Sequence, residues 1–231
     1  MADVKDLPLI VADPYPPYQY IDRGRILGLD HDLVVNAFKT SGLDVRIELH
    51  PWDECIRMLD NGVADAIFQI VKTPERERKY LFSDLLRKAV TVLLYKSNVP
   101  HFGLNIDSKI ERQLRGLRLG LVKGYSYGAP IDDLKGIVKV EVDGQEDLLT
   151  GLVDGRFDAA LIDRGVSIYL IDKLGFKGKL EEVKGFTITR ELYLAFRRDK
   201  VSLLKSFNEG LKRIRLNGLY ERIFQEYKLQ P

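Results

Sequence analysis

Short β-rich runs alternate with segments of helical periodicity along most of this chain. In the first hundred residues, apolar runs at 7–12, 45–49 and 64–70 are separated by such segments, and the pattern starts again near residue 117. Strands interleaved with helices are typical of βαβ units and a mostly parallel sheet, so the sequence predicts an α/β fold. Helices are expected over residues 52–61, 146–153, 201–216 and 219–227, and over a segment that Asp30 caps and Gly42 ends.

One segment of the first half has an echo in the second half. Residues 59–67, LDNGVADAI, resemble residues 153–160, VDGRFDAA, and their glycines Gly62 and Gly155 are 93 residues apart. In each segment a helix is expected to close at the glycine, and Asp-Ala then enters a buried strand. We interpret the echo as one helix–turn–strand unit used in each of two similarly built lobes. The alternative is chance recurrence of a short motif.

Composition excludes several classes of protein. The 231 residues carry 36 basic and 34 acidic side chains, a net charge of +2, which argues against a nucleic-acid surface. A single cysteine, Cys55, excludes an internal disulfide, and three scattered histidines make a metal centre improbable. No apolar run approaches the roughly 18–20 residues of a spanning helix. We therefore expect no metal, no cofactor and no nucleic-acid partner, and Cys55 is expected to pack in a core.

Candidate ligand-binding residues follow two of the predicted buried strands. Ligands of open α/β sheets lie beyond the carboxyl ends of the strands. The run 64–70 leads to Gln69, Val71 and the segment 73–76, TPER, and the run 157–162 leads to Asp163. If the lobes face each other, the Arg76 guanidinium and the Asp163 carboxylate meet in one cleft. This suits a ligand that carries a carboxylate and an ammonium group.

The segment TPER also predicts its own local structure. Thr73 can cap a helix, Pro74 fits the first helical position, and the free amides of a helix start attract an anion. Arg76 could then grip a carboxylate with two hydrogen bonds. The alternative is a surface helix whose Arg76 is solvated or pairs with Glu77 or Asp84.

Aromatic residues at predicted strand ends are the remaining candidates. Tyr15, Tyr18 and Tyr20 cluster in a proline-rich turn, and Trp52 follows a predicted strand. A loop aromatic can stack on a ligand and shield its charges from water, although core packing is the alternative and is preferred for Tyr20. The loop 124–128, GYSYG, can turn backbone amides toward an anion, but a plain strand–helix turn also explains it.

Taken in order, several of these stretches match a known family. The chain resembles the bacterial solute-binding proteins of the polar amino-acid type, family 3. The resemblance covers nearly the whole chain and is carried by residues 17–20 (PYQY), 28–33 (GLDHDL), 51–52 (PW), 62–68, 73–76 (TPER), 82–83, 155–163 and 216–227. It is closest to the branch with Pro-Trp and Gly-Tyr-Ser-Tyr-Gly, which includes transport receptors and sensor domains.

The resemblance implies the two-lobed type II periplasmic-binding-protein fold. Lobe 1 would comprise residues 1–95 plus 192–231 and lobe 2 residues 96–191, joined by hinge crossings near 95–97 and 189–191. The implied ligand is an amino acid or related carboxylate, taken up by lobe closure. Arg76 matches the carboxylate clamp and Asp163 the ammonium acceptor. The other implied site residues are Val71 and Ser126 (backbone amides to the carboxylate), Gln69 (near the ammonium), Tyr15 and Trp52 (against the ligand side chain), Tyr125 (bulk on the wall of lobe 2) and Tyr18.

The family further implies a monomer that is periplasmic or extracellular, with its signal sequence removed. Its partner would be the membrane permease of an ABC transporter or a sensor. Two alternatives remain open on the same scaffold. One is a dehydratase acting on a cyclic carboxylic acid such as arogenate or prephenate, with Glu191 or Asp13 as its acid. The other is the sensing domain of a membrane receptor. The sequence does not identify the ligand.

Overall fold

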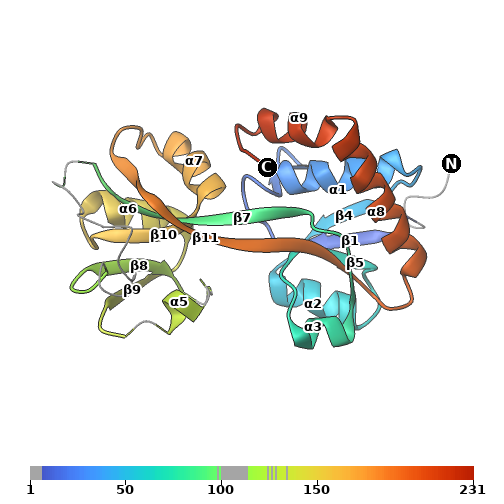
Figure 1. Ribbon diagram of the computed structural model, residues 1–231, viewed down its shortest axis with the longest axis horizontal. Helices are drawn as coiled ribbons and strands as arrows, with labels where there is room; N and C mark the ends of the chain where they lie inside the picture. Colours follow the sequence, from blue (N-terminus) through green and yellow to red (C-terminus); the bar gives the residue numbers. More distant parts are fainter. Residues whose placement is uncertain are drawn as a thin grey trace. The chain divides into compact units, whose positions relative to one another are not determined.

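The computed structural model describes residues 7–97, 99, 114–123, 125, 127, 129–133 and 135–231 (Figure 1). Contacts between residues divide the chain into two compact units. Unit 1 is Met1–Lys88 with Arg190–Pro231, and unit 2 is Ala89–Thr189. Two long strands, β7 (Arg87–Lys96) and β11 (Leu180–Phe196), contain the unit boundaries. No helix in the described part of the chain has the length and hydropathy that a membrane-spanning helix needs.

The sheet of unit 1 is mixed, with a parallel core and antiparallel strands beside it. Its strand order is β4-β1-β5-β11, in which β1 pairs parallel with both β4 and β5, while β11 and β6 are antiparallel additions. The strand β1 is buried throughout, as its unbroken apolar sequence predicts. The bounds are β1 Leu9–Ala12, β4 Arg46–Leu49, β5 Ala66–Ile70 and β6 Leu81–Phe82, with a separate hairpin of β2 (Tyr20–Asp22) and β3 (Arg25–Leu27).

The helices described in unit 1 cover both faces of this sheet. Figure 1 shows them divided between the two faces. On the first face are α1 (Leu29–Thr40), α8 (Val201–Leu216) and α9 (Leu219–Glu226); on the second are α2 (Trp52–Asp60) and α3 (Pro74–Lys79). The bounds of α2, α8 and α9 agree with the predicted helices to within one residue. The return of the last two helices onto α1 makes unit 1 discontinuous in sequence.

The contact between α1 and α8 is unusually close. A Cβ added at Gly210 of α8 would lie 1.8 Å from the carbonyl oxygen of Ala37 in α1, so only glycine fits there. Beside this contact, the rings of Phe38 and Phe207 pack with centroids 5.1 Å apart, and both side chains are fully buried. The two helices therefore share one continuous core.

The predicted role of Asp30 as a helix cap is wrong. The residue that precedes α1 is Gly28, and no side chain caps this helix. Asp30 lies inside the first turn with 0% of its surface exposed and accepts two hydrogen bonds from Arg87, at 2.5 and 2.9 Å. An unpaired buried carboxylate costs more free energy than an uncapped helix start. Arg87 lies too far from Asp30 in the sequence for the local pattern to reveal the pair.

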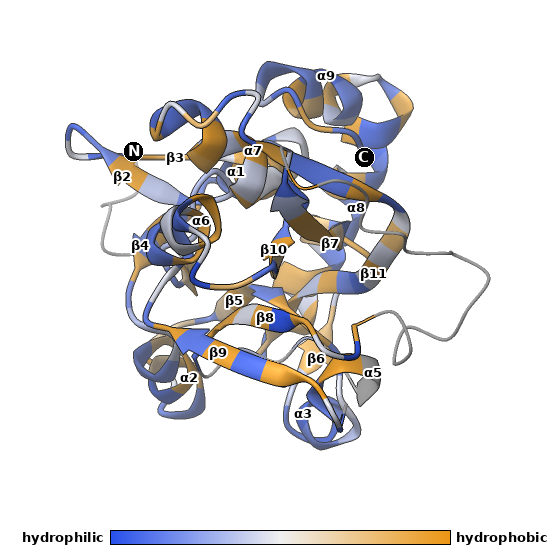
Figure 2. Ribbon diagram, turned by 90° about the vertical axis from the view of Figure 1, so that its left-hand side faces the viewer, coloured by the Kyte–Doolittle hydropathy of each residue, from blue (hydrophilic) through white to orange (hydrophobic). Residues whose placement is uncertain are grey.

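Unit 2 has a similar parallel core with antiparallel strands beside it. Its strand order is β11-β7-β10-β8-β9, in which β8 pairs parallel with β9 and β10, and β7 is antiparallel to β10. The edge strand β9 has the alternating hydropathy that predicted it, visible as stripes in Figure 2. The bounds are β8 Arg118–Val122, β9 Val138–Val142, β10 Ala159–Asp163, α5 Ala129–Asp132, α6 Gln145–Asp154 and α7 Arg164–Lys173.

The sequence echo corresponds to one repeated structural unit. Gly62 and Gly155 both adopt a left-handed backbone, with φ of 76° and 77°. In unit 1 the Asp65 carboxylate accepts a hydrogen bond from the amide of Leu9, the first residue of β1, at 2.8 Å. In unit 2 the Asp158 carboxylate accepts one from Arg118, the first residue of β8, also at 2.8 Å.

The same pairs are joined a second time through the backbone. The amides of Asp65 and Asp158 donate to the carbonyl oxygens of Leu9 and Arg118, at 2.8 and 2.9 Å. The two units therefore use the same aspartate clasp to fix the start of their first parallel strand.

Candidate functional site

In unit 1, the predicted ligand-binding residues lie at one edge of the sheet. Because β4, β1 and β5 are parallel neighbours, their carboxyl ends meet at this edge. Trp52 follows β4, Tyr15 follows β1, and Val71 and Arg76 follow β5. We call this edge, at which the strands end, the carboxyl edge. Ligands of open α/β sheets usually bind there.

Arg76 is held at this edge by three contacts. Its Nη1 donates to the carbonyl oxygen of Val71 at 3.0 Å, and its guanidinium lies 5.5 Å from the centroid of the Trp52 ring. Its backbone amide donates to Thr73 Oγ1 at 3.2 Å, which confirms the predicted cap with Pro74 at the helix start. Arg76 is also the only residue of α3 that is not exposed. The alternative pairing with Glu77 or Asp84 is not found in the described structure.

Tyr15 and Tyr18 form a stack beside this edge. Their rings are nearly parallel, with centroids 5.8 Å apart, and Tyr18 is buried. The Arg87 guanidinium lies 3.6 Å from the centre of the Tyr18 ring while it pairs with Asp30. The Tyr18 ring thus contacts both a cation and the Tyr15 ring, and Tyr15 is the less buried member of the stack.

Gln69 and Gln19 fix the geometry between β1 and β5. Gln69 has φ of +62° and lies opposite a register shift in β11, so it is the extra residue of a β-bulge. Its Oε1 accepts a hydrogen bond from Nε2 of the fully buried Gln19, which also donates to the Asp13 carbonyl at 2.9 Å. A left-handed backbone at a non-glycine residue is costly and persists where the surroundings enforce it. Gln19 was not predicted as a site residue, although it lies in the stretch 17–20 that carries the family resemblance.

Asp13 places a partly buried carboxyl at the end of β1. Burial raises its pKa from 3.8 to about 6, because few polar groups compensate for the loss of water around the charged form. A hydrogen bond from its own backbone amide lowers the pKa and offsets only part of the effect of burial. The group can therefore change its charge near neutral pH, which most carboxyls cannot do.

In unit 2, Asp163 ends β10 and begins α7. One of its carboxylate oxygens accepts hydrogen bonds from the amides of Gly165 at 2.9 Å and Val166 at 3.2 Å, and 4% of the residue is exposed. Asp163 also pairs with Thr91 of β7 in the sheet. The residue is therefore an N-cap and a nearly buried anion at the carboxyl edge of its own sheet.

The loop after β8 contains the other residues predicted in unit 2. Tyr125 is 46% exposed, and its amide donates to the Val122 carbonyl at 3.2 Å. Ser126 lies outside the described residues. Tyr127, which was not predicted as a site residue, is buried, and its hydroxyl accepts a hydrogen bond from the Val122 amide at 3.0 Å. The Tyr127 ring therefore anchors this loop to the end of β8.

Comparison with known proteins identifies the family. The model of the bacterial extracellular solute-binding proteins, family 3, matches residues 7–230. The chain belongs to this family. The histidine-binding periplasmic protein of Escherichia coli K12 is 27% identical over 231 residues, covering 94% of this chain and 86% of that protein.

Two solved structures show the same two-lobed fold. The arginine-, lysine-, histidine-binding protein ArtJ of Geobacillus stearothermophilus has a TM-score of 0.74 at 24% identity, covering 98% of this chain and 97% of the other. The ancestral amino-acid-binding protein AncCDT-1, a precursor of cyclohexadienyl dehydratase, has a TM-score of 0.75 at 24% identity, covering 95% and 94%. The predicted fold class, the type II periplasmic-binding-protein fold, is confirmed.

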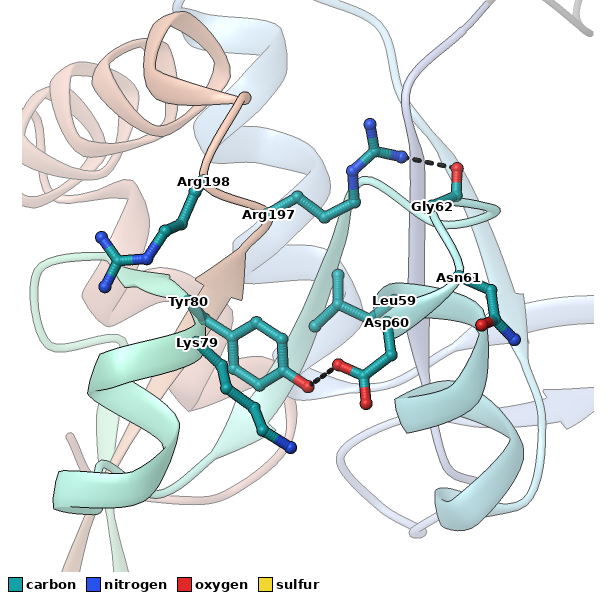
Figure 3. Close-up of a pocket in the computed structure, with 8 residues that line it drawn as sticks. All are labelled: Leu59, Asp60, Asn61, Gly62, Lys79, Tyr80, Arg197 and Arg198. Atoms are coloured by element: carbon teal, nitrogen blue, oxygen red, sulfur yellow. Dashed lines mark hydrogen bonds between the residues drawn. The ribbon is translucent and has the colours of Figure 1, made fainter.

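This family 3 protein also has a pocket at the opposite edge of the unit 1 sheet (Figure 3). It lies near Gly62, which precedes β5, and is lined mainly by polar side chains that already have protein partners. The Tyr80 hydroxyl donates to Asp60, and Arg197 donates to the Gly62 carbonyl and to Asp199. Arg198 points away from them and donates to the last carbonyls of α3. The pocket is therefore a junction between α2, α3 and the end of β11 rather than a set of unsatisfied groups.

The other polar and sulfur groups determine whether the described residues could hold a metal ion or react through a thiol. In the described part of the chain, no group of three histidine, cysteine, aspartate or glutamate side chains could hold a metal ion. Cys55 is fully buried in the core between α2 and the sheet, as predicted, and burial raises the pKa of its thiol to about 11. The thiolate form of Cys55, which is the reactive form, is therefore disfavoured.

Proposed function

We propose that this solute-binding protein binds an α-amino acid reversibly for uptake by an ABC transporter, with Arg76 holding the carboxylate and Asp163 the α-ammonium group. The observation that carries the proposal is the placement of Arg76. It is a partly buried guanidinium at the carboxyl edge of a parallel sheet, supported by Val71 and Trp52 and paired with no carboxylate of the described chain.

The contacts of Arg76 leave its guanidinium able to take a carboxylate. Of its five N–H donors, the described structure uses one, toward the Val71 carbonyl. The Trp52 ring supports one side of the group without consuming donors. A planar guanidinium matches a carboxylate through two parallel hydrogen bonds, so the remaining donors suit the carboxylate of an amino acid.

Asp163 supplies the opposite charge. It is an anion at the end of a buried strand, and its cap hydrogen bonds orient the carboxylate. The ligand is proposed to pack its side chain against Tyr15 and Trp52, with Tyr18 behind Tyr15 and Gln69 near the ammonium. Val71 and Ser126 are proposed to give backbone amides to the carboxylate, and Tyr125 is proposed to limit the size of the ligand.

Binding is proposed to favour a closed state of two lobes, residues 1–95 plus 192–231 and residues 96–191. The ligand makes charged contacts with both lobes only in the closed state. Ligand binding therefore shifts the population toward the closed state. The relatives named above support an amino acid, since histidine, arginine and lysine appear in their names. The protein is proposed to act as a periplasmic or extracellular monomer that delivers its ligand to a membrane permease, without a chemical step.

A thermal-shift screen of the standard amino acids tests the proposal. A ligand at a hundred times its Kd stabilises the native state by about 2.7 kcal/mol, which raises the Tm by several degrees. Arg76→Met is expected to weaken binding of the best ligand by about 2–5 kcal/mol, or at least about 30-fold. The matched control is Arg78→Met, which removes an exposed arginine of the same short helix.

Asp163→Asn separates binding from stability. Asparagine is as good an N-cap as aspartate, so the Tm of the free protein is expected to stay within a few degrees while affinity falls. Asp154→Asn, at the exposed end of α6, is the control. Unchanged affinity in both Arg76→Met and Asp163→Asn would refute the proposed clamp. If the protein turned over arogenate or prephenate, the dehydratase alternative would replace the proposed binding function.

A further inference from the structure

We propose that Lys72 binds a second anionic group of the ligand, so that an acidic amino acid binds more tightly than its amide. The inference deepens the proposed function and rests on it, because Lys72 lies at the same sheet edge as Arg76. It concerns the side chain of the ligand rather than the α-carboxylate and α-ammonium groups.

The register of the sheet places Lys72 at this edge. Lys72 comes two residues after Ile70, the last residue of β5. Ile70 pairs with Tyr193 of the antiparallel strand β11, and the register ends there. Lys72 and Tyr193 therefore lie close together at the carboxyl end of β5, the edge at which the ligand is proposed to bind.

Two aromatic rings hold the Lys72 ammonium group. Its Nζ lies 4.1 Å from the centre of the Tyr193 ring and 5.7 Å from that of Phe82. The two rings meet edge to face, with centroids 6.1 Å apart. The faces of aromatic rings attract a cation but do not neutralise its charge, and they leave its three N–H donors available.

Lys72 has no anionic partner in the part of the chain that the structure describes. No ion pair within 4.0 Å involves its Nζ, although the side chain is only partly exposed. Glu191 and Glu77 both raise the pKa of Tyr193, but neither forms an ion pair with Lys72 in the described structure. Glu191 instead accepts the hydrogen bond of the Tyr193 hydroxyl at 2.5 Å. A partly desolvated cation beside a ligand-binding edge is well suited to an incoming carboxylate.

The order of the strands separates this cation from the carboxyl of Asp13. Asp13 follows β1 and Lys72 follows β5, next to β11, in a sheet with the order β4-β1-β5-β11. The positive charge thus lies on the β11 side of β5 and the acidic group on the β1 side. The structure assigns the ligand's second carboxylate to the β11 side.

Calorimetric titration with aspartate, asparagine, glutamate and glutamine tests this assignment. The protein is expected to bind one of the two acidic amino acids at least about tenfold more tightly than the corresponding amide. Lys72→Met keeps the length and packing of the side chain against the rings and is expected to abolish this preference while affinity for the amide changes less than twofold. Lys72→Arg is expected to retain the preference. Lys79→Met is the control, because Lys79 is exposed and lies in the pocket at the other edge.

Each outcome bears on one proposal or the other. Equal losses for acid and amide in Lys72→Met, with an unchanged Tm, would overturn the role of Lys72 in discrimination. A preference for neutral or cationic amino acids that depends on Arg76 would also overturn it but would support the amino-acid function. Failure of every standard amino acid to bind would instead overturn the proposed function and this inference with it.

Discussion

Burial of the Asp13 carboxyl has a direct thermodynamic consequence. Its pKa is about 6 in the folded protein against an ordinary value of 3.8, so the folded state binds more protons than the unfolded state between these pH values. Stability therefore falls as pH rises from about 4 to about 6, and the full cost is present above pH 6. The shift of about two units corresponds to at most about 3 kcal/mol.

We predict that Asp13→Asn stabilises the free protein at pH 7 and has little effect at pH 4. The gain at pH 7 is expected to approach the cost described above, because asparagine carries no charge to desolvate. Urea denaturation at the two pH values measures it. Asp53→Asn, on the exposed start of α2, is the control. The same change in unfolding free energy at both pH values would contradict the prediction.

The sequence predicted the candidate site residues that follow strands better than the residues that hold them in place. Arg76, Trp52 and Tyr15 could be proposed because strand ends are recognisable from apolar runs. The Gln69 bulge and the buried Gln19 could not, since a left-handed backbone at glutamine has no sequence signature and depends on the register of β11. Arg87, which packs against Tyr18, was also missed because it is distant in sequence from the proline-rich turn.

Among the secondary-structure elements, α1 and β7 are joined by the buried pair of Asp30 and Arg87. Both side chains are almost completely excluded from solvent, with exposed fractions of 0% and 2%. Breaking such a pair leaves a buried charge without compensation and costs more than replacing both partners. Arg87 also supports the Tyr18 and Tyr15 stack, so the effect reaches the proposed site.

We predict that Arg87→Met destabilises the protein by about 3–5 kcal/mol, measured by chemical denaturation. The double variant Asp30→Leu with Arg87→Met is expected to recover most of this loss, because no charge is then buried. If the double variant is as unstable as the sum of the two single variants, the pair does not act as a unit. Arg25→Met, an exposed position in β3, provides a control.

The close approach of α1 and α8 leads to a second prediction at this scale. Gly210→Ala is expected to destabilise the protein by about 1–3 kcal/mol, because its methyl group would collide with the backbone of Ala37. Alanine normally favours a helix over glycine by about 1 kcal/mol, so the sign of the effect tests the contact. A thermal melt of the variant measures it. An increase in Tm would contradict the close contact.

Helices and strands were predicted more accurately than their ends and partners. The helix α8 has the predicted bounds because its apolar residues recur on one face between clear breaks. The hairpin of β2 and β3 was missed, since its strands are three residues long and none of their residues is buried. Asp30 was misassigned because a side chain near a helix start has the same local sequence whether it caps the helix or enters the core.

At the scale of the molecule, each unit keeps its first parallel strand in place by its own aspartate clasp. The echo of residues 59–67 in residues 153–160 predicted this repeat, because the two glycines and aspartates have structural roles that few other residues can fill. The sequence did not predict which strand each aspartate would hold, since that depends on long-range pairing.

The discontinuity of unit 1 predicts how a shortened chain behaves. A chain that ends at Thr189 keeps all of unit 2 but lacks α8, α9 and the part of β11 that pairs with β5. In this chain, amides of β8 and β10 are expected to resist hydrogen exchange while those of β1 and β5 exchange rapidly. Hydrogen-exchange mass spectrometry of the shortened and full chains measures the difference. Equal protection of β1 in both would contradict the prediction.

The return of the last two helices onto α1 also sets an order of events at the ribosome. Phe38 is made early, but its packing partner Phe207 is added only after the whole of unit 2 has been translated. The apolar face of α1 therefore lacks its packing partner during more than half of translation. Nascent chains stalled before α8 should be good substrates for chaperones that bind exposed apolar segments.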